Sequence, residues 1–287
     1  DFESLYAAFR HFVRNVPFYG LGVLCVDHPT VQKLAEEIAD RRIVTYGFNE
    51  NADVSAQNVK FNFDGVVFDV VIKPDYLEKQ RELENYVGEN VTALPAILKD
   101  IYLPMMGKHN VQNALAVVAI AQELGISDAV LRHAFKTFKG IKRRFTQVGS
   151  VHGVRIIDDY AHHPTEIDAL ISSLRMLYPG KKITGVFQPH LFSRTKDFSY
   201  QFSQSLSALD SLILLPIYPA REAPILGISS ELLLEGVSIK DKKLLSKEGL
   251  LHYLKDFNNA VLVTIGAGDI DRLVQPIKEI LTLNLDL

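Results

Sequence analysis

The sequence predicts an α/β protein of two domains, the second built on a Rossmann-like, doubly wound sheet. Its 287 residues are enough for about two domains with separate cores. Apolar strand-like runs alternate with amphipathic helical stretches, which is typical of helices layered on a parallel sheet. The alternation restarts after residue 145, so we expect one domain at residues 1–145 and the other at 146–287.

The first domain begins with apolar residues at helical spacing that end at Pro17, and this pattern indicates an amphipathic helix. Farther on, Asp64-Gly65 between two β-branched runs predicts a hairpin. Residues 74–90 are the most charged and least periodic part of the chain, which favours an excursion from the fold. The expected helices are 2–16, 29–40, 111–124 and 127–138, and the expected strands are 20–26, 41–46, 59–63 and 66–72.

The second domain contains four apolar runs that we expect to be strands of one parallel sheet. A polar or glycine-rich loop follows each run, and loops at the carboxyl ends of parallel strands share one rim, so the four loops predict a cleft. Gly266-Ala267-Gly268 indicates a tight turn only, because Asp271 stands where a dinucleotide fingerprint has its third glycine. The expected strands are 154–158, 182–188, 211–217 and 260–265, and the expected helices are 165–177, 197–209, 230–235, 247–256 and 270–281.

Composition and charge exclude several classes of protein. A net charge of −3 gives no electrostatic case for binding nucleic acid or an anionic membrane, whose partners carry clustered Lys and Arg. No apolar run approaches the roughly twenty residues of a membrane helix. The one cysteine, Cys25, lies in an apolar run and cannot form an internal disulfide, which favours a reducing, cytoplasmic compartment. We therefore expect small-molecule partners.

The segment from Asp158 to Glu166 is the most informative in the chain. An apolar run ends there in two carboxylates, a tyrosine and two histidines, and Pro-Thr-Glu then opens a helix. A solvated turn rarely gathers two acids and two histidines, because packing such groups together costs more than using Gly, Ser or Asn. The pattern favours a functional site over a simple turn.

Asn110 and Asn113 are three residues apart where a helix is expected to begin, and therefore lie on one face of its first turn. An amide side chain offers both a donor and an acceptor, which is what the edge of an adenine ring needs. A helix N-cap is an equal alternative for Asn110. Asn113 is harder to explain in that way, because it already lies inside the helix.

Arg143 and Arg144 come just before the expected domain junction. A guanidinium there can form a bidentate pair with phosphate oxygens, although a surface ion pair is the commoner role of two adjacent arginines. His190 and Arg194 follow the second strand of the second domain and could hold an anionic substrate at its rim. The chain has no Gly-x-x-x-x-Gly-Lys-Ser/Thr phosphate loop, so a cradle for a triphosphate must come from elsewhere.

In order and spacing these residues resemble the Mur ligases of peptidoglycan synthesis. The motifs are Gly-Lys-His-Asn-x-x-Asn-Ala at 107–114, Arg-Arg-Phe at 143–145, Asp-Asp-Tyr-Ala-His-His-Pro-Thr-Glu at 158–166, Gln-Pro-His at 188–190 and Tyr-Pro-Ala-x-Glu-x-Pro at 218–224. The resemblance implies that residues 1–145 are the later part of a central ATPase domain and residues 146–287 a C-terminal ligase domain. It also implies that the UDP-binding domain, the phosphate loop and the Mg²⁺ ligands precede Asp1, so we expect the chain alone to be inactive and to hold no metal.

The resemblance implies ATP-dependent amide ligation. ATP would phosphorylate the carboxylate of UDP-N-acetylmuramate, and the amine of L-alanine would attack the acyl phosphate. Such phosphoryl transfer needs positioned positive charge more than a nucleophilic side chain. The residues that the resemblance assigns to ATP are Asn110, Asn113, Arg144 and Asp159, and those assigned to the substrates are Tyr160, His162, His190 and Arg194. Arg144 and His162 would be catalytic.

Three alternatives remain open. The first is the recycling ligase of the same family, which joins a ready-made murein peptide to the same nucleotide sugar. The second is a metal-dependent hydrolase with Asp159, His162 and His163 as ligands, because carboxylates and neutral imidazoles suit zinc or iron. The third is a noncatalytic nucleotide-binding module.

Overall fold

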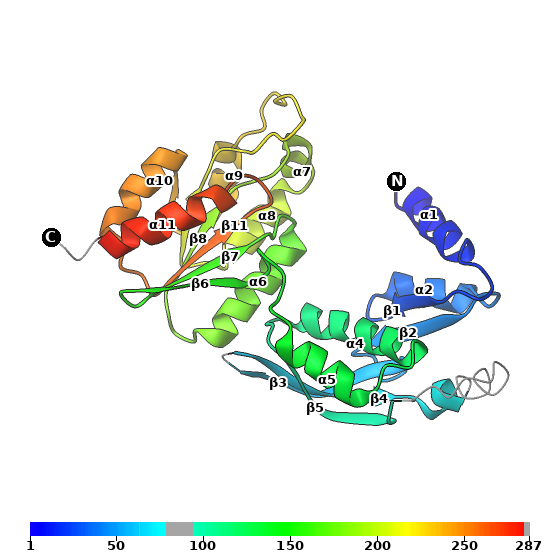
Figure 1. The fold of residues 1–287 in the computed structure, drawn as a ribbon. Coiled ribbons are helices and arrows are strands. Elements are labelled where there is room, and N and C mark those ends of the chain that lie inside the picture. The colour runs from blue at the N-terminus through cyan, green and yellow to red at the C-terminus, as the bar shows by residue number, and fades with distance from the viewer. Residues whose placement is uncertain (63, 79–93, 284–287) are drawn as a thin grey trace. The chain divides into compact units, whose positions relative to one another are not determined.

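A computed structural model of the chain describes residues 1–62, 64–78 and 94–283 (Figure 1). The chain divides into two compact units, residues 1–139 and 140–287. Each unit has its own mixed sheet, helices and core, so the predicted α/β class is confirmed. The junction expected after residue 145 lies inside the second unit, because residues 140–145 belong to that unit.

The sheet of the first unit has the order β1-β2-β3-β4-β5. Its strands are β1 (Gly22–Cys25), β2 (Ile43–Gly47), β3 (Val54–Asn62), β4 (Gly65–Ile72) and β5 (Ile97–Leu103). The first three are parallel, and β3, β4 and β5 are antiparallel. The predicted hairpin joins β3 to β4 at Gly65, where a Cβ would overlap the carbonyl oxygen of Leu103. β5 lies outside the sequence-based expectation, because Lys99 and Asp100 interrupt its apolar alternation.

The helices of the first unit follow the apolar periodicity of the sequence. They are α1 (Phe2–Arg14), α2 (Pro29–Glu37), α4 (Lys108–Glu123) and α5 (Asp128–Thr137). α4 packs on β1, β2 and β3, and α5 packs on β5. The core between them includes the fully buried Phe68, Leu98 and Leu115. Of the charged segment at 74–90, residues 74–78 are helical, and the part from residue 79 onward lies outside the described residues.

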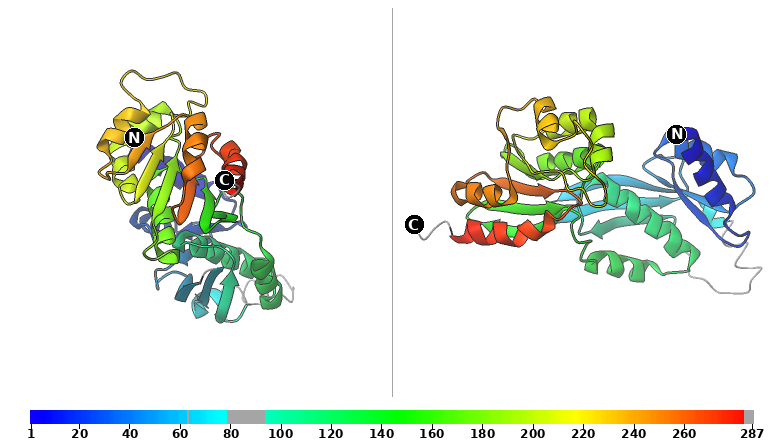
Figure 2. Two further views of the ribbon diagram at one scale, coloured as in Figure 1. Left: turned by 90° about the vertical axis from the view of Figure 1, so that its left-hand side faces the viewer. Right: turned by 90° about the horizontal axis from the view of Figure 1, so that it is seen from above.

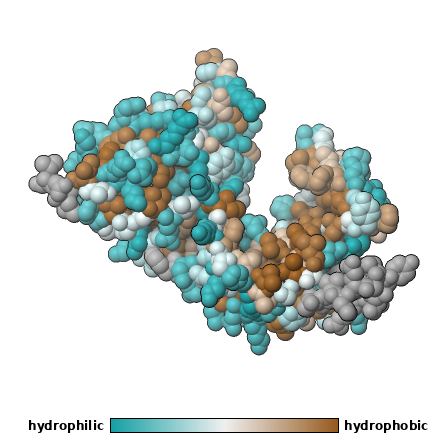
Figure 3. All heavy atoms as spheres, viewed as in Figure 1, coloured by the Kyte–Doolittle hydropathy of each residue, from teal (hydrophilic) through white to brown (hydrophobic). Residues whose placement is uncertain are grey.

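Two helices of the first unit expose apolar faces. α1 has the amphipathic pattern that the sequence predicts, yet Val13 is its one buried residue. Figure 3 shows apolar side chains gathered over α1 and over α4. The exposed large side chains on these helices are Phe2, Leu5, Phe9 and Phe12 on α1 and Val117 and Ile120 on α4. Contiguous apolar surface of this kind marks a place where further protein can pack.

The sheet of the second unit has the order β10-β9-β8-β11-β7-β6. Its strands are β6 (Thr146–Val151), β7 (Val154–Asp159), β8 (Ile183–Phe187), β9 (Ser211–Leu214), β10 (Lys242–Leu244) and β11 (Val261–Ile265). All neighbouring pairs are parallel except β6 with β7. The four predicted strands are confirmed as β7, β8, β9 and β11. β6 and β10 are too polar or too short for the apolar pattern to indicate them.

Helices cover both faces of the second sheet (Figure 2). They are α6 (Pro164–Leu177), α7 (Phe192–Asp197), α8 (Ser199–Leu206), α9 (Ser230–Gly236), α10 (Lys247–Tyr253), η1 (Leu254–Asp256) and α11 (Asp271–Leu283). Successive strand residues enter opposite cores: Ile157 and Phe187 pack toward α6, α8 and α9, whereas Ile156 and Val186 pack toward α10 and α11. The strands are therefore continuously apolar, as parallel strands buried on both faces must be.

The helix predicted over residues 197–209 is confirmed as α8, with shorter bounds. The sequence does not predict the short helix α7 before it, and the two helices meet at Phe198. Phe198 has φ −118° and ψ 19°, outside the helical region, so the axis changes there. Within the described part of the chain, no helix has the length and apolar character needed to cross a bilayer.

Candidate active site

Aromatic rings from three loops form a row at the carboxyl rim of the second sheet. The Tyr160 and His162 rings, after β7, have centroids 5.3 Å apart, and the His162 and His190 rings lie 6.3 Å apart. The His190 ring, after β8, stacks on the Tyr218 ring, after β9, at 5.7 Å. The structure thus brings together three of the residues predicted to face the substrates.

Asp159 ends β7 and holds the backbone on both sides of the rim. One of its carboxylate oxygens accepts the N–H of Phe145 at 2.7 Å, and the other accepts the N–H of Ala161 at 2.8 Å. The side chain is only 8% exposed, and this burial raises the pKa of Asp159 to about 6. Its contact with a nucleotide stays a prediction, because both carboxylate oxygens in this structure accept backbone N–H groups. We call such residues, which hold the backbone of the site in place, frame residues.

Asp158 and Arg143 form a second part of that frame. The Thr264 hydroxyl donates to Asp158 at 2.7 Å, and the Arg143 Nε lies 3.4 Å from the same carboxylate. Arg143 also donates to the carbonyl oxygens of Gly266 and Gly268, the latter at 3.3 Å, in the loop after β11. Burial raises the pKa of Asp158, although Thr264 and Arg143 oppose that shift. Arg143, which the sequence does not single out over its neighbour, ties the β7 and β11 loops together.

Arg144 is the more exposed arginine of the pair and meets Glu166 at the start of α6. The two side chains approach to 3.4 Å. The second carboxylate oxygen of Glu166 accepts the backbone N–H groups of His162, at 2.9 Å, and His163, at 3.2 Å. Although burial opposes the shift, the His162 N–H and the nearby positive charges lower the pKa of Glu166. Glu166 therefore links two predicted catalytic residues, and its capping-box position is the sequence signal that indicates its role.

The surroundings of His162 fix its tautomer. Its Nδ1 lies 2.9 Å from the carbonyl oxygen of Tyr160 and 3.2 Å from a carboxylate oxygen of Glu166. Both neighbours are acceptors, so Nδ1 carries the ring proton. In the neutral ring, Nε2 then carries the lone pair, and His162 can accept a proton there.

His190 and Arg194 lie within reach of each other across the first turn of α7. An Nη atom of Arg194 is 3.5 Å from Nδ1 of His190. Burial, Arg194 and His162 together lower the pKa of His190, against the opposite influence of Glu222. The neutral imidazole and the arginine leave one cation at this position, which suits an anionic ligand group.

Gln188, just after β8, connects the rim to the loop that follows β11. Its amide donates to the Asp269 carboxylate at 2.9 Å and accepts the N–H of Ile270 at 3.0 Å. A Cβ at Gly268 would meet the Gln188 amide oxygen at 2.5 Å, so the glycine allows the two loops to approach. The predicted reading of residues 266–268 as a tight strand-to-helix turn is confirmed.

In the first unit, the two predicted adenine contacts differ in their surroundings. Asn110 is buried and its amide donates to the carbonyl oxygen of Met106 at 2.6 Å, whereas Asn113 is exposed. Gly107, with φ 97°, is the N-cap of α4, so the alternative that Asn110 is this cap is wrong. Asn110 instead holds the turn that leads into the helix.

Residues that follow β1 and β2 contact the start of α4. Asp27, just after β1, accepts the backbone N–H of Phe48 at 2.8 Å and the Gln112 side-chain amide at 2.5 Å. Lys108 places its ammonium 4.3 Å from the centre of the Phe48 ring. An aromatic ring and a cation therefore lie together at the helix N-terminus.

The described residues contain no group of three His, Cys, Asp or Glu side chains arranged to hold a metal ion. In the set proposed for a hydrolase, Asp159 directs its oxygens at backbone N–H groups. His163 is the N-cap of α6 and packs its ring 4.6 Å from that of Phe198. These contacts leave the metal-hydrolase alternative without a ligand set.

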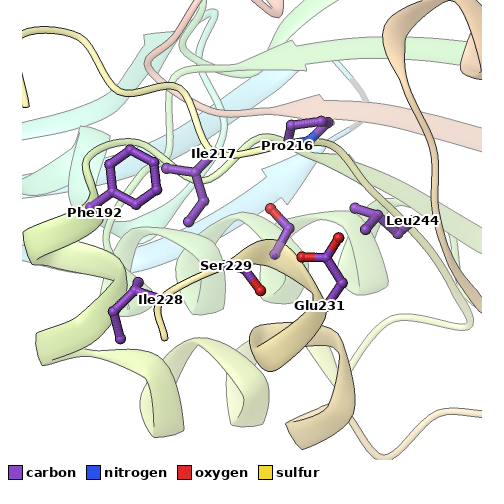
Figure 4. Close-up of a pocket in the computed structure, with 8 residues that line it drawn as sticks. Phe192, Pro216, Ile217, Ile228, Ser229, Glu231 and Leu244 are labelled. Atoms are coloured by element: carbon purple, nitrogen blue, oxygen red, sulfur yellow. The ribbon is translucent and has the colours of Figure 1, made fainter. Parts of the chain in front are cut away.

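A small hollow lies beside the rim, next to the first residue of α7 (Figure 4). It has a volume of about 210 Å³ and a mainly apolar lining. Phe192 of α7 and Ile217 of the loop after β9 both line it, together with Ile228 and Leu244. The start of α7 is thus seated against the loop that follows β9.

Two family models match the chain. The Mur ligase middle domain matches residues 1–121, and the Mur ligase, glutamate ligase domain matches residues 143–272. The second match contains every rim residue described above.

Curated relatives match nearly the whole chain. A UDP-N-acetylmuramate–L-alanine ligase of Agrobacterium fabrum is 41% identical over 276 residues, which cover 94% of this chain and 55% of that protein. A ligase of the same name from Phenylobacterium zucineum is 40% identical, over 94% of this chain and 54% of its own length. The chain therefore spans about half the length of these relatives.

Solved structures show the same fold. The UDP-N-acetylmuramate–alanine ligase of Thermotoga maritima has a TM-score of 0.70 at 22% identity, over 97% of this chain and 55% of that one. A folylpolyglutamate synthase of Mycobacterium tuberculosis, complexed with ADP and AMPPCP, has a TM-score of 0.61 at 16% identity, over 92% of this chain and 55% of that one.

Proposed function

The chain belongs to the Mur ligase family, and from this we propose that it takes part in the ATP-dependent joining of L-alanine to UDP-N-acetylmuramate. The observation that carries the proposal is the identity of about 40% to ligases of that name over 94% of the chain. Because the chain spans about half the length of those relatives, we assign the activity to a polypeptide that also supplies a counterpart of the remaining length.

The proposed reaction has two stages. The γ-phosphoryl group of ATP passes to the carboxylate of the sugar nucleotide, and the amine of L-alanine then attacks the acyl phosphate. The tetrahedral intermediate collapses with loss of inorganic phosphate and leaves an amide. Both stages develop negative charge on oxygen, so fixed cations and donors stabilise their transition states.

Arg144 and His162 are the residues that we propose to act on the reacting atoms. Arg144 would neutralise charge on the transferred phosphoryl group, and its contact with Glu166 holds the guanidinium at the rim. His162 would accept a proton at Nε2 from the attacking amine, since Nδ1 is occupied by its acceptors. Arg194 and the neutral His190 would bind a substrate carboxylate, with Tyr160 beside them.

For the nucleotide, we propose that the exposed amide of Asn113 contacts adenine. Asn110 would contact adenine through its side-chain amide oxygen, because its side-chain NH₂ group already donates to the carbonyl oxygen of Met106. Asp159 would support the ribose site indirectly: its carboxylate accepts the backbone N–H groups of Phe145 and Ala161 and so holds the loop after β7 in place. We propose that Mg²⁺ accompanies ATP and takes its protein ligands from outside the described residues, which offer no ligand cluster.

The test joins this chain to the remaining part of a relative such as the Agrobacterium fabrum ligase. Phosphate release that needs ATP, UDP-N-acetylmuramate and L-alanine together is the expected result, and a murein tripeptide should not replace alanine. Arg144→Ala and His162→Ala should each lower kcat about 100-fold or more. Lys142→Ala, two residues before Arg144 and exposed, is the matched control and should change little.

Three outcomes contradict parts of the proposal. Turnover with the tripeptide in place of alanine would identify the recycling ligase instead. Nucleotide binding without any turnover would favour the noncatalytic module. Steady turnover by the 287-residue chain alone would refute the assignment of the activity to a longer polypeptide.

A further inference from the structure

The short helix α7, which carries Arg194, lacks a capping side chain of its own. Its N-cap is Leu191, which cannot accept a hydrogen bond through its side chain and has a left-handed backbone with φ 73°. The first N–H groups of a helix have no partner inside the helix and need an acceptor. The acceptor for α7 must therefore come from another part of the chain.

Glu222, in the loop between β9 and α9, supplies that acceptor. One carboxylate oxygen accepts the backbone N–H of Ser193 at 2.9 Å, and the other accepts the Ser193 hydroxyl. These hydrogen bonds lower the pKa of Glu222, so the group is ionised at neutral pH. A carboxylate at this end of a helix also interacts favourably with the helix dipole.

The same two loops are joined at a second point. The N–H of Tyr218 donates to the carbonyl oxygen of Pro189 at 2.8 Å, and the N–H of Leu191 donates to the carbonyl oxygen of Tyr218 at 3.0 Å. These bonds make a parallel bridge between His190 and Tyr218, whose rings also stack. His190 is thus fixed by the bridge on one side, and Arg194 follows the turn that Glu222 holds on the other.

We propose that Glu222 is a positioning residue, which holds the first turn of α7 so that His190 and Arg194 present one cationic site to a substrate carboxylate. The proposal deepens the proposed function and rests on it for the identity of the substrate. Glu222 acts through Ser193 and does not itself contact the reacting atoms. Its sequence signal is a lone acid in the Tyr-Pro-Ala-x-Glu-x-Pro motif, 29 residues from its partner.

The first experiment uses the 287-residue chain and needs no catalysis. In Glu222→Gln, the NMR titration midpoint of the His190 ring should fall, because the carboxylate opposes the effects of Arg194 and His162 on that ring. In Glu222→Ala, nuclear Overhauser effects between the His190 and Tyr218 rings should weaken. Glu248→Gln makes the same charge change in the first turn of α10 and should alter neither signal. Wild-type His190 signals in both Glu222 variants would overturn the proposal.

The second experiment uses the complete ligase. Glu222→Ala should raise the KM for the amino acid about tenfold, with a smaller change in kcat, because the contact that it loosens binds rather than transforms the substrate. Glu222→Gln should recover part of this loss, since its amide oxygen still accepts the Ser193 N–H. A fall in kcat with an unchanged KM would overturn the positioning role. Altered His190 signals without any ligase turnover would refute the proposed function while supporting the contact between the loops.

Discussion

The rim of the second unit and the start of α4 in the first unit both carry family motifs, but they are built differently. At the rim, Asp159, Arg143 and Glu166 each join two segments. At α4, the contacts of Asn110 stay within four residues, and Asn113 points to solvent. A rim assembled from distant segments is organised before any ligand arrives, whereas the helix start offers a surface that a ligand has to complete.

Within each of two motifs, one residue holds the backbone in place and a neighbouring residue lies nearer the surface. Arg143 binds carbonyl oxygens inside the rim, while Arg144 lies nearer the surface. Asn110 and Asn113 divide in the same way along one helix face. The comparison predicts that frame residues control stability and that surface residues control ligand binding.

The largest expected effect is a pH dependence that belongs to Asp159. Its pKa of about 6 lies above its ordinary value of 3.8, so between these pH values the folded chain keeps a proton that the unfolded chain has released. The stabilisation is complete below pH 3.8 and is lost as the pH rises through 6. Asp159→Asn removes this titration, so relative to wild type the variant should gain about 2.5 kcal/mol between pH 4 and pH 7.

Denaturant unfolding of both proteins across that pH range measures the difference, and hydrogen exchange assigns it to the second unit. The starting offset at pH 4 does not matter, because only the change with pH is compared. A constant difference between the two proteins would mean that the Asp159 carboxyl ionises at its ordinary pKa.

Next in size is the loss of Arg143. Arg143→Met should destabilise the second unit by about 2 kcal/mol, because Asp158 loses an ion pair and two glycine carbonyl oxygens lose a donor in a partly buried place. Hydrogen exchange of peptides from β7 and β11 reports the change. Equal protection in the variant and the wild type would show that the guanidinium contributes nothing to the frame.

A smaller loss is expected at the start of α4. Asn110→Ala should destabilise the first unit by about 1 kcal/mol, because the carbonyl oxygen of Met106 loses its buried donor. Exchange rates of the amides in α4 are the measurement. An effect as large as that of Arg143→Met would remove the contrast between the two regions.

The smallest effects on stability are expected for the two surface residues. Arg144→Met and Asn113→Ala should each change the unfolding free energy by less than about 0.5 kcal/mol, since neither replaces a buried contact. In the complete ligase, Asn113→Ala should still raise the KM for ATP. Isothermal titration with ADP checks binding separately, and a strongly destabilised Asn113→Ala would place this residue in the frame.

The sequence predicts most of the fold because both sheets follow simple apolar periods. It does not indicate β6, where Gly149 and polar residues break the alternation, or β10, which has three residues. The short helix α7 also escapes it, because its six mostly polar residues are too few to show an apolar period.

At the candidate site, the sequence identifies which loops matter but not what each side chain does. Asp158 and Asp159 look equivalent in the motif, yet alternate strand residues face different neighbours, so one meets Thr264 and the other meets the backbone at 145. Glu222 and Ser193 are 29 residues apart, and no local pattern pairs them. Contacts of this length depend on the strand order, which the sequence alone leaves open.

The short strand β10 has a consequence for how the molecule behaves in a crowded solution. It closes one side of the second sheet with only three residues, two of which are lysines. Lys242 donates to the carbonyl oxygens of Leu234 and Val237 at the end of α9, so its side chain connects the strand to that helix. A short edge strand that carries lysines offers few backbone groups for pairing with a strand of another molecule. It therefore disfavours edge-to-edge aggregation of this sheet.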